Sequence, residues 1–413
     1  MRSLIFGTLV LATAAVAVRA QDAKLSAADA KRLVAEWCGA DAKKAAAARA
    51  KLEATRAEDR KLIAAALASA PFTPPKGRRP LTERTFLDTI ELPEAETKRG
   101  RFIIKLPKEY DDRKPMPAVF KLHGSGDDCQ SYAKNIPDPK APCITVTPEI
   151  PSADRMSWDA GWRLIDALFR YLPRNYNVDL ERVYMTGYSA GSGASFTVAQ
   201  IWPHRVAGFY AMGRLHWAFH VKPEPCMDAL REIPGYFVVG LRDTDERVNG
   251  YRTAEAYYAK TKLPGVFHFV EKKEHEYIGE HDTKAHDFLF KTSRKPQPKK
   301  IRSIFFEYRD DKDAEIRRRR WWLEAAEGGF AADAEFTASV EGNVVAVQAP
   351  KLREFYVHVN DALVDLDKPV TVKLDDKEVH NAVVERAVAF LLDGFDAERD
   401  RGRLFWNRIH VKR

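Results

Sequence analysis

The segment Arg182-Val183-Tyr184-Met185-Thr186-Gly187-Tyr188-Ser189-Ala190-Gly191 decides the fold that this sequence predicts. Its first five residues are typical of a β-strand, and residues 195–201 after it are typical of a helix. Gly187 and Gly191 flank Ser189 with the spacing Gly-x-Ser-x-Gly, which marks a sharp turn from strand to helix. Glycines avoid clashes in such a turn, and the free amides of the helix N-terminus favour negative charge. The pattern therefore predicts Ser189 as a nucleophile.

A second loop of small residues precedes this turn. The predicted strand 118–122 ends in His123-Gly124-Ser125-Gly126. Small side chains at a strand end allow main-chain amides to approach a substrate oxygen. We therefore predict an oxyanion hole whose donors are the backbone N–H groups of Ser125 and Ala190. An ordinary turn at the end of the strand is the alternative.

Short apolar runs alternate with helical segments on both sides of the serine turn. The strand candidates in this part of the chain are residues 143–147, 183–186, 236–240 and 266–270, and helix candidates are residues 161–171 and 253–261. Alternation of this kind predicts a mostly parallel sheet covered by helices.

Residues 85–292 resemble α/β-hydrolases of the secreted esterase branch, which includes polyhydroxybutyrate depolymerases and feruloyl or acetylxylan esterases. The resemblance rests on residues 123–126, on residues 177–187 and on the serine turn. It implies an α/β-hydrolase fold, a Ser-Asp-His triad, and a small or polymer-linked carboxylic ester as substrate, with no cofactor and no metal. Prolyl-oligopeptidase-like peptidases resemble the same stretch, so a serine peptidase stays open, as does a catalytically silent binding protein.

The resemblance implies that the triad acid follows a late strand, because the order of the triad in this family is Ser, acid, His. The strand Gly235–Gly240 is followed by Leu241-Arg242-Asp243, which puts Asp243 at the family's acid position. A buried carboxylate there would orient the histidine. Asp245 is the alternative.

The triad base is expected after the last strand, where two histidines compete. Residues 279–281, Gly-Glu-His, are most similar to the family's Gly-x-Gly-His loop, so we predict His281 as the base and keep His275 as the alternative. His286 on the next helix and His268 within the strand are interpreted as structural. This histidine cluster lacks the His-Glu-x-x-His spacing of a helical zinc site, so no metal is expected.

The first 20 residues predict a cleaved secretory signal. Met1-Arg2 is followed by an apolar run that ends at Val18, and Val18-Arg19-Ala20 suits cleavage near Ala20. The run is shorter than the roughly 20 apolar residues of a spanning helix, so we expect no membrane span and a secreted or periplasmic protein. The formal charge of +8 falls to +6 without Arg2 and Arg19, which does not indicate a nucleic-acid partner.

Two changes in composition divide the remaining chain. Residues 21–76 predict a helical N-terminal region and a Pro-rich linker, and residues 77–292 the catalytic domain. Residues 293–302 are rich in Pro and Lys and predict a second linker. Short strands separated by turns then predict a small β-rich accessory domain over residues 303–413.

Four cysteines occur in this chain, and an oxidising compartment would permit a disulfide. Cys129 and Cys143 flank one loop and are the preferred pair, with unpaired buried thiols as the alternative. The spacing of these two residues with Cys38 and Cys226 matches no metal-ligand motif.

Overall fold

The computed structural model describes residues 24–73, 79–92, 99–150, 160–215, 223–305, 318–331 and 333–413. The chain divides into two compact units, Met1–Ala66 and Leu67–Arg413. The predicted signal, residues 1–20, lies outside the described residues, as do residues 74–78 at the first predicted linker. Within the described ranges, no helix has the length and apolar character needed to cross a membrane.

The first unit is built from short helices. These are α1 (Ala27–Trp37), α2 (Ala42–Glu53), η1 (Ala57–Asp59) and most of α3 (Arg60–Leu67). The Ser26 hydroxyl accepts a hydrogen bond from the Asp29 N–H at the start of α1, and the Asp41 carboxylate caps α2 in the same way. Such caps satisfy N–H groups that lack a partner within the helix. The helical N-terminal region is therefore present, as predicted.

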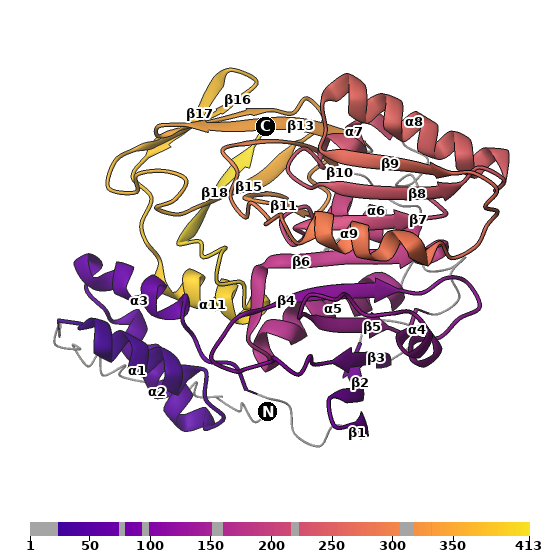
Figure 1. The fold of residues 1–413 in the computed structure, drawn as a ribbon. Helices are drawn as coiled ribbons and strands as arrows, with labels where there is room; N and C mark the ends of the chain where they lie inside the picture. Colours follow the sequence, from indigo (N-terminus) through magenta and orange to yellow (C-terminus); the bar gives the residue numbers. More distant parts are fainter. Residues whose placement is uncertain are drawn as a thin grey trace, which may run out of the picture. The chain divides into compact units, whose positions relative to one another are not determined.

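A nine-stranded sheet is the centre of the second unit in the described part of the chain (Figure 1). Its strands are β1 (Arg79–Thr82), β2 (Thr85–Glu91), β3 (Arg99–Lys105), β4 (Met116–Leu122), β5 (Ile144–Pro148), β6 (Val178–Tyr188), β7 (Gly208–Met212), β8 (Gly235–Gly240) and β9 (Gly265–Val270). They lie in the order β1-β2-β3-β5-β4-β6-β7-β8-β9. β1, β2 and β3 pair antiparallel, and β3 is also antiparallel to β5. The strands β5, β4, β6, β7, β8 and β9 run parallel to one another. The sheet with its covering helices confirms an α/β-hydrolase-like fold.

Helices cover both faces of this sheet because successive side chains of a strand point to opposite faces. In β7, Phe209 and Ala211 belong to one buried cluster, whereas Tyr210 and Met212 belong to another. The first cluster includes residues of α5 (Ala160–Asn175), α6 (Ala190–Ile201) and α8 (Asp245–Thr261). The second includes residues of α9 (Asp282–Leu289), which Figure 1 shows in front of the sheet. The two buried clusters hold the strands of the sheet in place, and with them the loops at the strand ends.

The C-terminal part adds two smaller sheets among the described residues, as the predicted β-rich tail requires. One has the order β10-β13-β14-β16-β17 and the other β11-β12-β15-β18. The strands are β10 (Lys300–Phe305), β11 (Arg319–Arg320), β12 (Leu323–Ala325), β13 (Ala334–Glu341), β14 (Val344–Gln348), β15 (Glu354–Val359), β16 (Val370–Leu374), β17 (Lys377–Ala382) and β18 (Asn407–Lys412). The helix α11 (Val388–Glu398) was not predicted.

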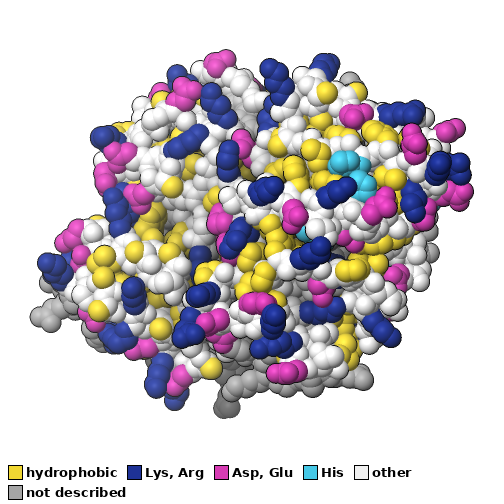
Figure 2. Space-filling view, in the orientation of Figure 1, with side chains coloured by type: hydrophobic (Ala, Val, Ile, Leu, Met, Phe, Trp, Pro, Cys, Tyr) yellow, Lys and Arg dark blue, Asp and Glu magenta, His cyan; other side chains and the backbone are white. Residues whose placement is uncertain are grey.

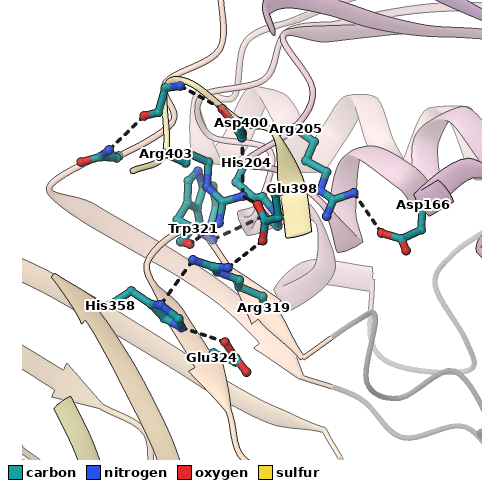
Figure 3. Close-up of polar contacts among 12 residues, drawn as sticks. Asp166, His204, Arg205, Arg319, Trp321, Glu324, His358, Glu398, Asp400 and Arg403 are labelled. Atoms are coloured by element: carbon teal, nitrogen blue, oxygen red, sulfur yellow. Dashed lines mark hydrogen bonds and ion pairs between the residues drawn. The ribbon is translucent and has the colours of Figure 1, made fainter. Parts of the chain in front are cut away.

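Polar contacts to His204 join this C-terminal part and the linker before it to the nine-stranded part of the unit: the Trp321 N–H donates to His204 Nδ1 at 3.4 Å (Figure 3), and Arg294 Nη1 donates to the His204 carbonyl at 2.8 Å. Arg294, inside the second predicted linker, is 4% exposed and its Nη2 lies 2.7 Å from Asp400 Oδ1. Arg403 Nη1 lies 2.8 Å from Glu398 Oε2, and Arg403 Nη2 donates to the Trp321 carbonyl. The linker is thus anchored in the core at Arg294, in keeping with a single compact unit from Leu67 to Arg413.

The preferred cysteine pair is not a disulfide. Cys129 and Cys143 are both buried free thiols, and they belong to different clusters of the core. Cys129 begins the short helix α4 (Cys129–Asn135), which turns it toward Ile103. Burial raises the pKa of Cys143 to about 12, so this thiol stays protonated. The prediction of a bond between the two is therefore wrong.

Candidate active site

Ser189 occupies the turn between β6 and α6 in a strained backbone conformation. Its φ is 54° and its ψ is −117°, a region that residues with a side chain rarely adopt. A Cβ atom added to Gly187 would lie 2.2 Å from the Gly191 carbonyl carbon, and one added to Gly191 would lie 2.0 Å from the Leu122 oxygen. Both glycines are therefore required by close backbone approach. The Ser189 N–H donates to the Met212 carbonyl and holds the turn against β7.

The serine hydroxyl lies next to a histidine that is bound by a carboxylate. Ser189 Oγ is 2.8 Å from His275 Nε2, and His275 Nδ1 is 2.7 Å from Asp243 Oδ2. The His275 side chain is 27% exposed, whereas the Asp243 side chain is 1% exposed. The hydroxyl, the imidazole and the carboxylate are thus joined by two hydrogen bonds whose lengths would allow proton transfer.

His281, the base predicted from its sequence context, does not contact Ser189. It ends the short turn η2 (Gly279–His281), and its Nδ1 lies 3.1 Å from the Tyr236 hydroxyl. The ring centroids of His281 and His268 are 4.7 Å apart. Figure 2 shows histidine side chains at the surface, in the area where Figure 1 places β9 and α9. Because η2 leads directly into α9, which packs on β7 and β8, His281 is held on a sheet face. The structure therefore brings the alternative His275, and not the predicted His281, to the Ser189 hydroxyl.

Asp243, and not the alternative Asp245, contacts the imidazole. Asp245 is the first residue of α8, whereas Asp243 lies in the loop after β8. Asp243 Oδ1 accepts hydrogen bonds from the Thr244 N–H at 2.7 Å and from Arg247 Nη1 at 2.8 Å. Burial alone would raise the pKa of Asp243, but hydrogen bonds from Arg247, the imidazole and the Thr244 amide outweigh it and lower that pKa. The carboxylate is therefore ionised at neutral pH.

The two predicted oxyanion donors lie on segments that border the serine. Ala190 is the first residue of α6, so its N–H has no acceptor within the helix. A Cβ atom on Gly124 would lie 3.5 Å from Ser189 Cβ, which places the loop of the exposed Ser125 beside Ser189.

His123 fixes this loop, a role that sequence reasoning missed. The residue is buried, its Nδ1 lies 2.8 Å from the Gly124 oxygen, and its Nε2 accepts from the Ile150 N–H at 3.0 Å. In a trans peptide the carbonyl and the next N–H point in opposite directions, so holding the Gly124 carbonyl also sets the direction of the Ser125 N–H. The strand-end position of His123 before two small residues was the available signal.

Tyr188 fixes the other side of the site and was also missed. Its ring stacks on His275 with centroids 5.4 Å apart, and its hydroxyl donates to the His275 carbonyl at 3.0 Å. Tyr277 meets the same tyrosine ring edge-on, with centroids 5.6 Å apart. The motif Gly-x-Ser-x-Gly leaves position 188 open, so only the fold reveals this contact.

One group of side chains has the spacing of metal ligands among the described residues, and it lies outside the triad. It consists of Asp128, Cys129 and Glu149. Asp128 caps α4, and Glu149 accepts from the Cys129 N–H at 2.9 Å, so both carboxylates already have partners. This group shares no residue with the contact of Ser189, His275 and Asp243.

No family model matches the chain, and no curated protein matches it. Among solved structures it is similar to a thermostable esterase, with 19% identity and a TM-score of 0.42, over 51% of this chain and 64% of that chain. A ferulic acid esterase has 16% identity and a TM-score of 0.42, over 50% and 97% of the two chains. An S-formylglutathione hydrolase from Staphylococcus aureus has 12% identity and a TM-score of 0.41, over 52% and 98%. The chain thus spans less than two thirds of the length of the first of these, and its identity to each of the three is below 20%.

Proposed function

We propose that this chain is a serine hydrolase that cleaves a carboxylic ester through an acyl-enzyme on Ser189. The observation that carries the proposal is the continuous contact from Ser189 Oγ through both His275 nitrogens to Asp243, at 2.8 and 2.7 Å. The strained serine turn and the two bordering amides support the same reaction. The predicted N-terminal signal supports export, and a small or polymer-linked acyl or aryl ester is the proposed substrate.

The hydrogen bonds define the proton transfers of this reaction. Asp243 Oδ2 accepts a hydrogen bond from the Nδ1–H of His275, so Nε2 is left to accept the Ser189 proton. As Oγ attacks the ester carbonyl carbon, the amides of Ala190 and Ser125 hold the developing oxyanion. The imidazolium then protonates the departing alkoxide, which leaves as the alcohol.

Hydrolysis of the acyl-enzyme repeats the same steps with water. His275 takes a proton from water, the resulting hydroxide attacks the acyl carbon, and the imidazolium returns a proton to Ser189 Oγ. One oxyanion donor is typically worth about 10²–10³ in rate, so the two amides supply a large share of the acceleration.

Hydrolysis of nitrophenyl esters from acetate to octanoate by the purified protein tests this proposal, with a peptide nitroanilide in parallel and Ser189→Ala as the matched control. We expect turnover of the esters that disappears in Ser189→Ala. An inert wild type, or full turnover in Ser189→Ala, would contradict the proposal. Faster cleavage of the nitroanilide than of every ester would make the chain a peptidase instead.

A further inference from the structure

Arg247 contacts the oxygen of the triad acid that the histidine does not use. Arg247 Nη1 lies 2.8 Å from Asp243 Oδ1, whereas Oδ2 of the same carboxylate faces His275. The Arg247 side chain is 28% exposed, and the carboxylate that it contacts is 1% exposed. The guanidinium therefore lies between the buried acid and the solvent.

This contact has a geometric consequence. Asp243 Oδ1 receives two donors, the Thr244 amide and Arg247, so the carboxylate cannot rotate without breaking both hydrogen bonds. Arg247 is one helical turn after Asp243, near the start of α8, and the helix fixes the approach of its side chain. Charge-assisted hydrogen bonds of this kind are about twice as strong as neutral ones.

It also has an electrostatic consequence. An ionised Asp243 attracts a proton to the imidazole, and the fixed positive charge of Arg247 opposes that attraction. Removing the charge would let the carboxylate retain the imidazolium to higher pH. A protonated imidazole cannot accept the serine proton, so the effect would appear at the acid side of the pH profile.

The geometry points to Arg247 as a positioning residue that directs Asp243 toward His275 and whose fixed positive charge opposes protonation of the imidazole. This inference rests on the proposed function of Ser189 and His275.

Two other described residues near His275, Tyr188 and Glu276, do not supply this charge. Tyr188 stacks on the ring from the serine turn, and burial raises the pKa of Tyr188, which keeps its phenol neutral. Glu276 follows His275 in the same loop, and its charge is paired with Lys273 at 3.5 Å. Arg247, by contrast, contacts the triad acid itself.

The test compares two uncharged variants, Arg247→Met and Arg247→Gln, with the charged variant Arg247→Lys. Arg242→Met is the matched control, because Arg242 is exposed and precedes Asp243 directly. The pH dependence of kcat/KM is measured on nitrophenyl acetate, and protonation of His275 is followed by NMR, which needs no turnover. We expect both uncharged variants to move the acid limb and the NMR midpoint upward by about one pH unit. Arg247→Lys should move them by less than half of that, and Arg242→Met should leave them unchanged.

Two results would overturn the inference. A fall in kcat at every pH with an unmoved acid limb means that Arg247 only packs against the site. An unmoved NMR midpoint in the uncharged variant that folds overturns it whether or not the protein is active. If the wild type hydrolyses no ester but the midpoint moves as expected, the proposed function fails and the electrostatic role of Arg247 stands.

Discussion

Two histidines in different regions of the second unit are bound by a carboxylate in almost the same way. In the candidate active site, His275 Nδ1 lies 2.7 Å from Asp243 Oδ2. In the C-terminal part, His358 Nε2 lies 2.7 Å from Glu324 Oε2, as Figure 3 shows. By this distance alone the two pairs are indistinguishable.

The two pairs differ in the partner of the second imidazole nitrogen and in the exposure of the histidine side chain. For His275 the second nitrogen meets the hydroxyl of Ser189, and the side chain is 27% exposed. For His358 it lies 3.3 Å from Arg319 Nη2, and the side chain is 5% exposed. An acid paired with an imidazole therefore indicates a catalytic base only where a nucleophile and an open approach for substrate accompany it.

The largest effect should come from the active-site member of this comparison. His275→Ala is expected to lower kcat/KM on a nitrophenyl ester by at least about 10³-fold, because His275 Nε2 is the group placed to accept the Ser189 proton. The double variant with Ser189→Ala should be no worse than either single one, since the residues act as a unit. Steady-state kinetics checks both statements. A loss of less than tenfold in His275→Ala would remove this histidine from the mechanism.

The two acids should then differ in what they control. Asp243→Asn is expected to lower kcat/KM by about 10²–10⁴-fold, because the amide no longer selects the productive imidazole tautomer. Glu324→Gln should leave kcat/KM within about threefold, since Glu324 pairs with the buried His358 away from the serine. Equal losses in the two variants would abolish the distinction between the sites.

The buried ion pairs of the C-terminal part should govern stability instead. Arg403→Met removes a fully buried guanidinium from its pair with Glu398, whose side chain is 17% exposed, and is expected to reduce the free energy of unfolding by about 3–5 kcal/mol. Turnover per folded molecule should stay unchanged. Urea unfolding measures the first quantity and active-site titration the second. A loss below about 1 kcal/mol in Arg403→Met would show that this pair does not govern the stability of the fold.

Acid should weaken the fold through His358. Burial, with Arg319 next to the ring, lowers the pKa of His358 to about 4. The unfolded chain binds a proton at this residue below about pH 6.5, so stability falls between pH 6.5 and 4, by up to about 3 kcal/mol. Urea unfolding at pH 7 and 4.5 measures the fall. His358→Gln should reduce this fall in the free energy of unfolding, and the exposed control His410→Gln should not. An equal fall in the wild type and both variants would show that His358 is not its cause.

The smallest effect is expected at the histidine that the sequence pattern favoured. His281→Ala removes a contact with the Tyr236 hydroxyl and none with Ser189, so kcat/KM should fall by less than about threefold. Kinetics beside His275→Ala provides the comparison. A loss as large as that of His275→Ala would reinstate the assignment from sequence.

The serine turn was predictable because its constraints are local. Gly187 and Gly191 are forced by backbone contacts within a few residues of Ser189 and by the end of β4. Asp243 was placed by its position after a strand, a rule of the same kind. The alternation of apolar runs similarly predicted the sheet, whose two faces are filled by alternate side chains.

The choice of base was not predictable in the same way. His275 and His281 follow one strand six residues apart, and the path of the loop between β9 and α9 decides which ring reaches Ser189. The contact of Arg247 could not be predicted for a related reason: a motif specifies the position of the acid Asp243 but not the residue that binds its second carboxylate oxygen. The failed pairing of Cys129 with Cys143 likewise depended on the direction in which α4 turns its first residue.

Labelling by a fluorophosphonate, followed by mass spectrometry of the intact and digested protein, tests the central claim most directly. The claim predicts one adduct on Ser189 in the wild type, a similar rate in His281→Ala, and a rate at least about 10²-fold lower in His275→Ala. An adduct on another residue, no adduct at all, or slow labelling of His281→Ala with fast labelling of His275→Ala would contradict it.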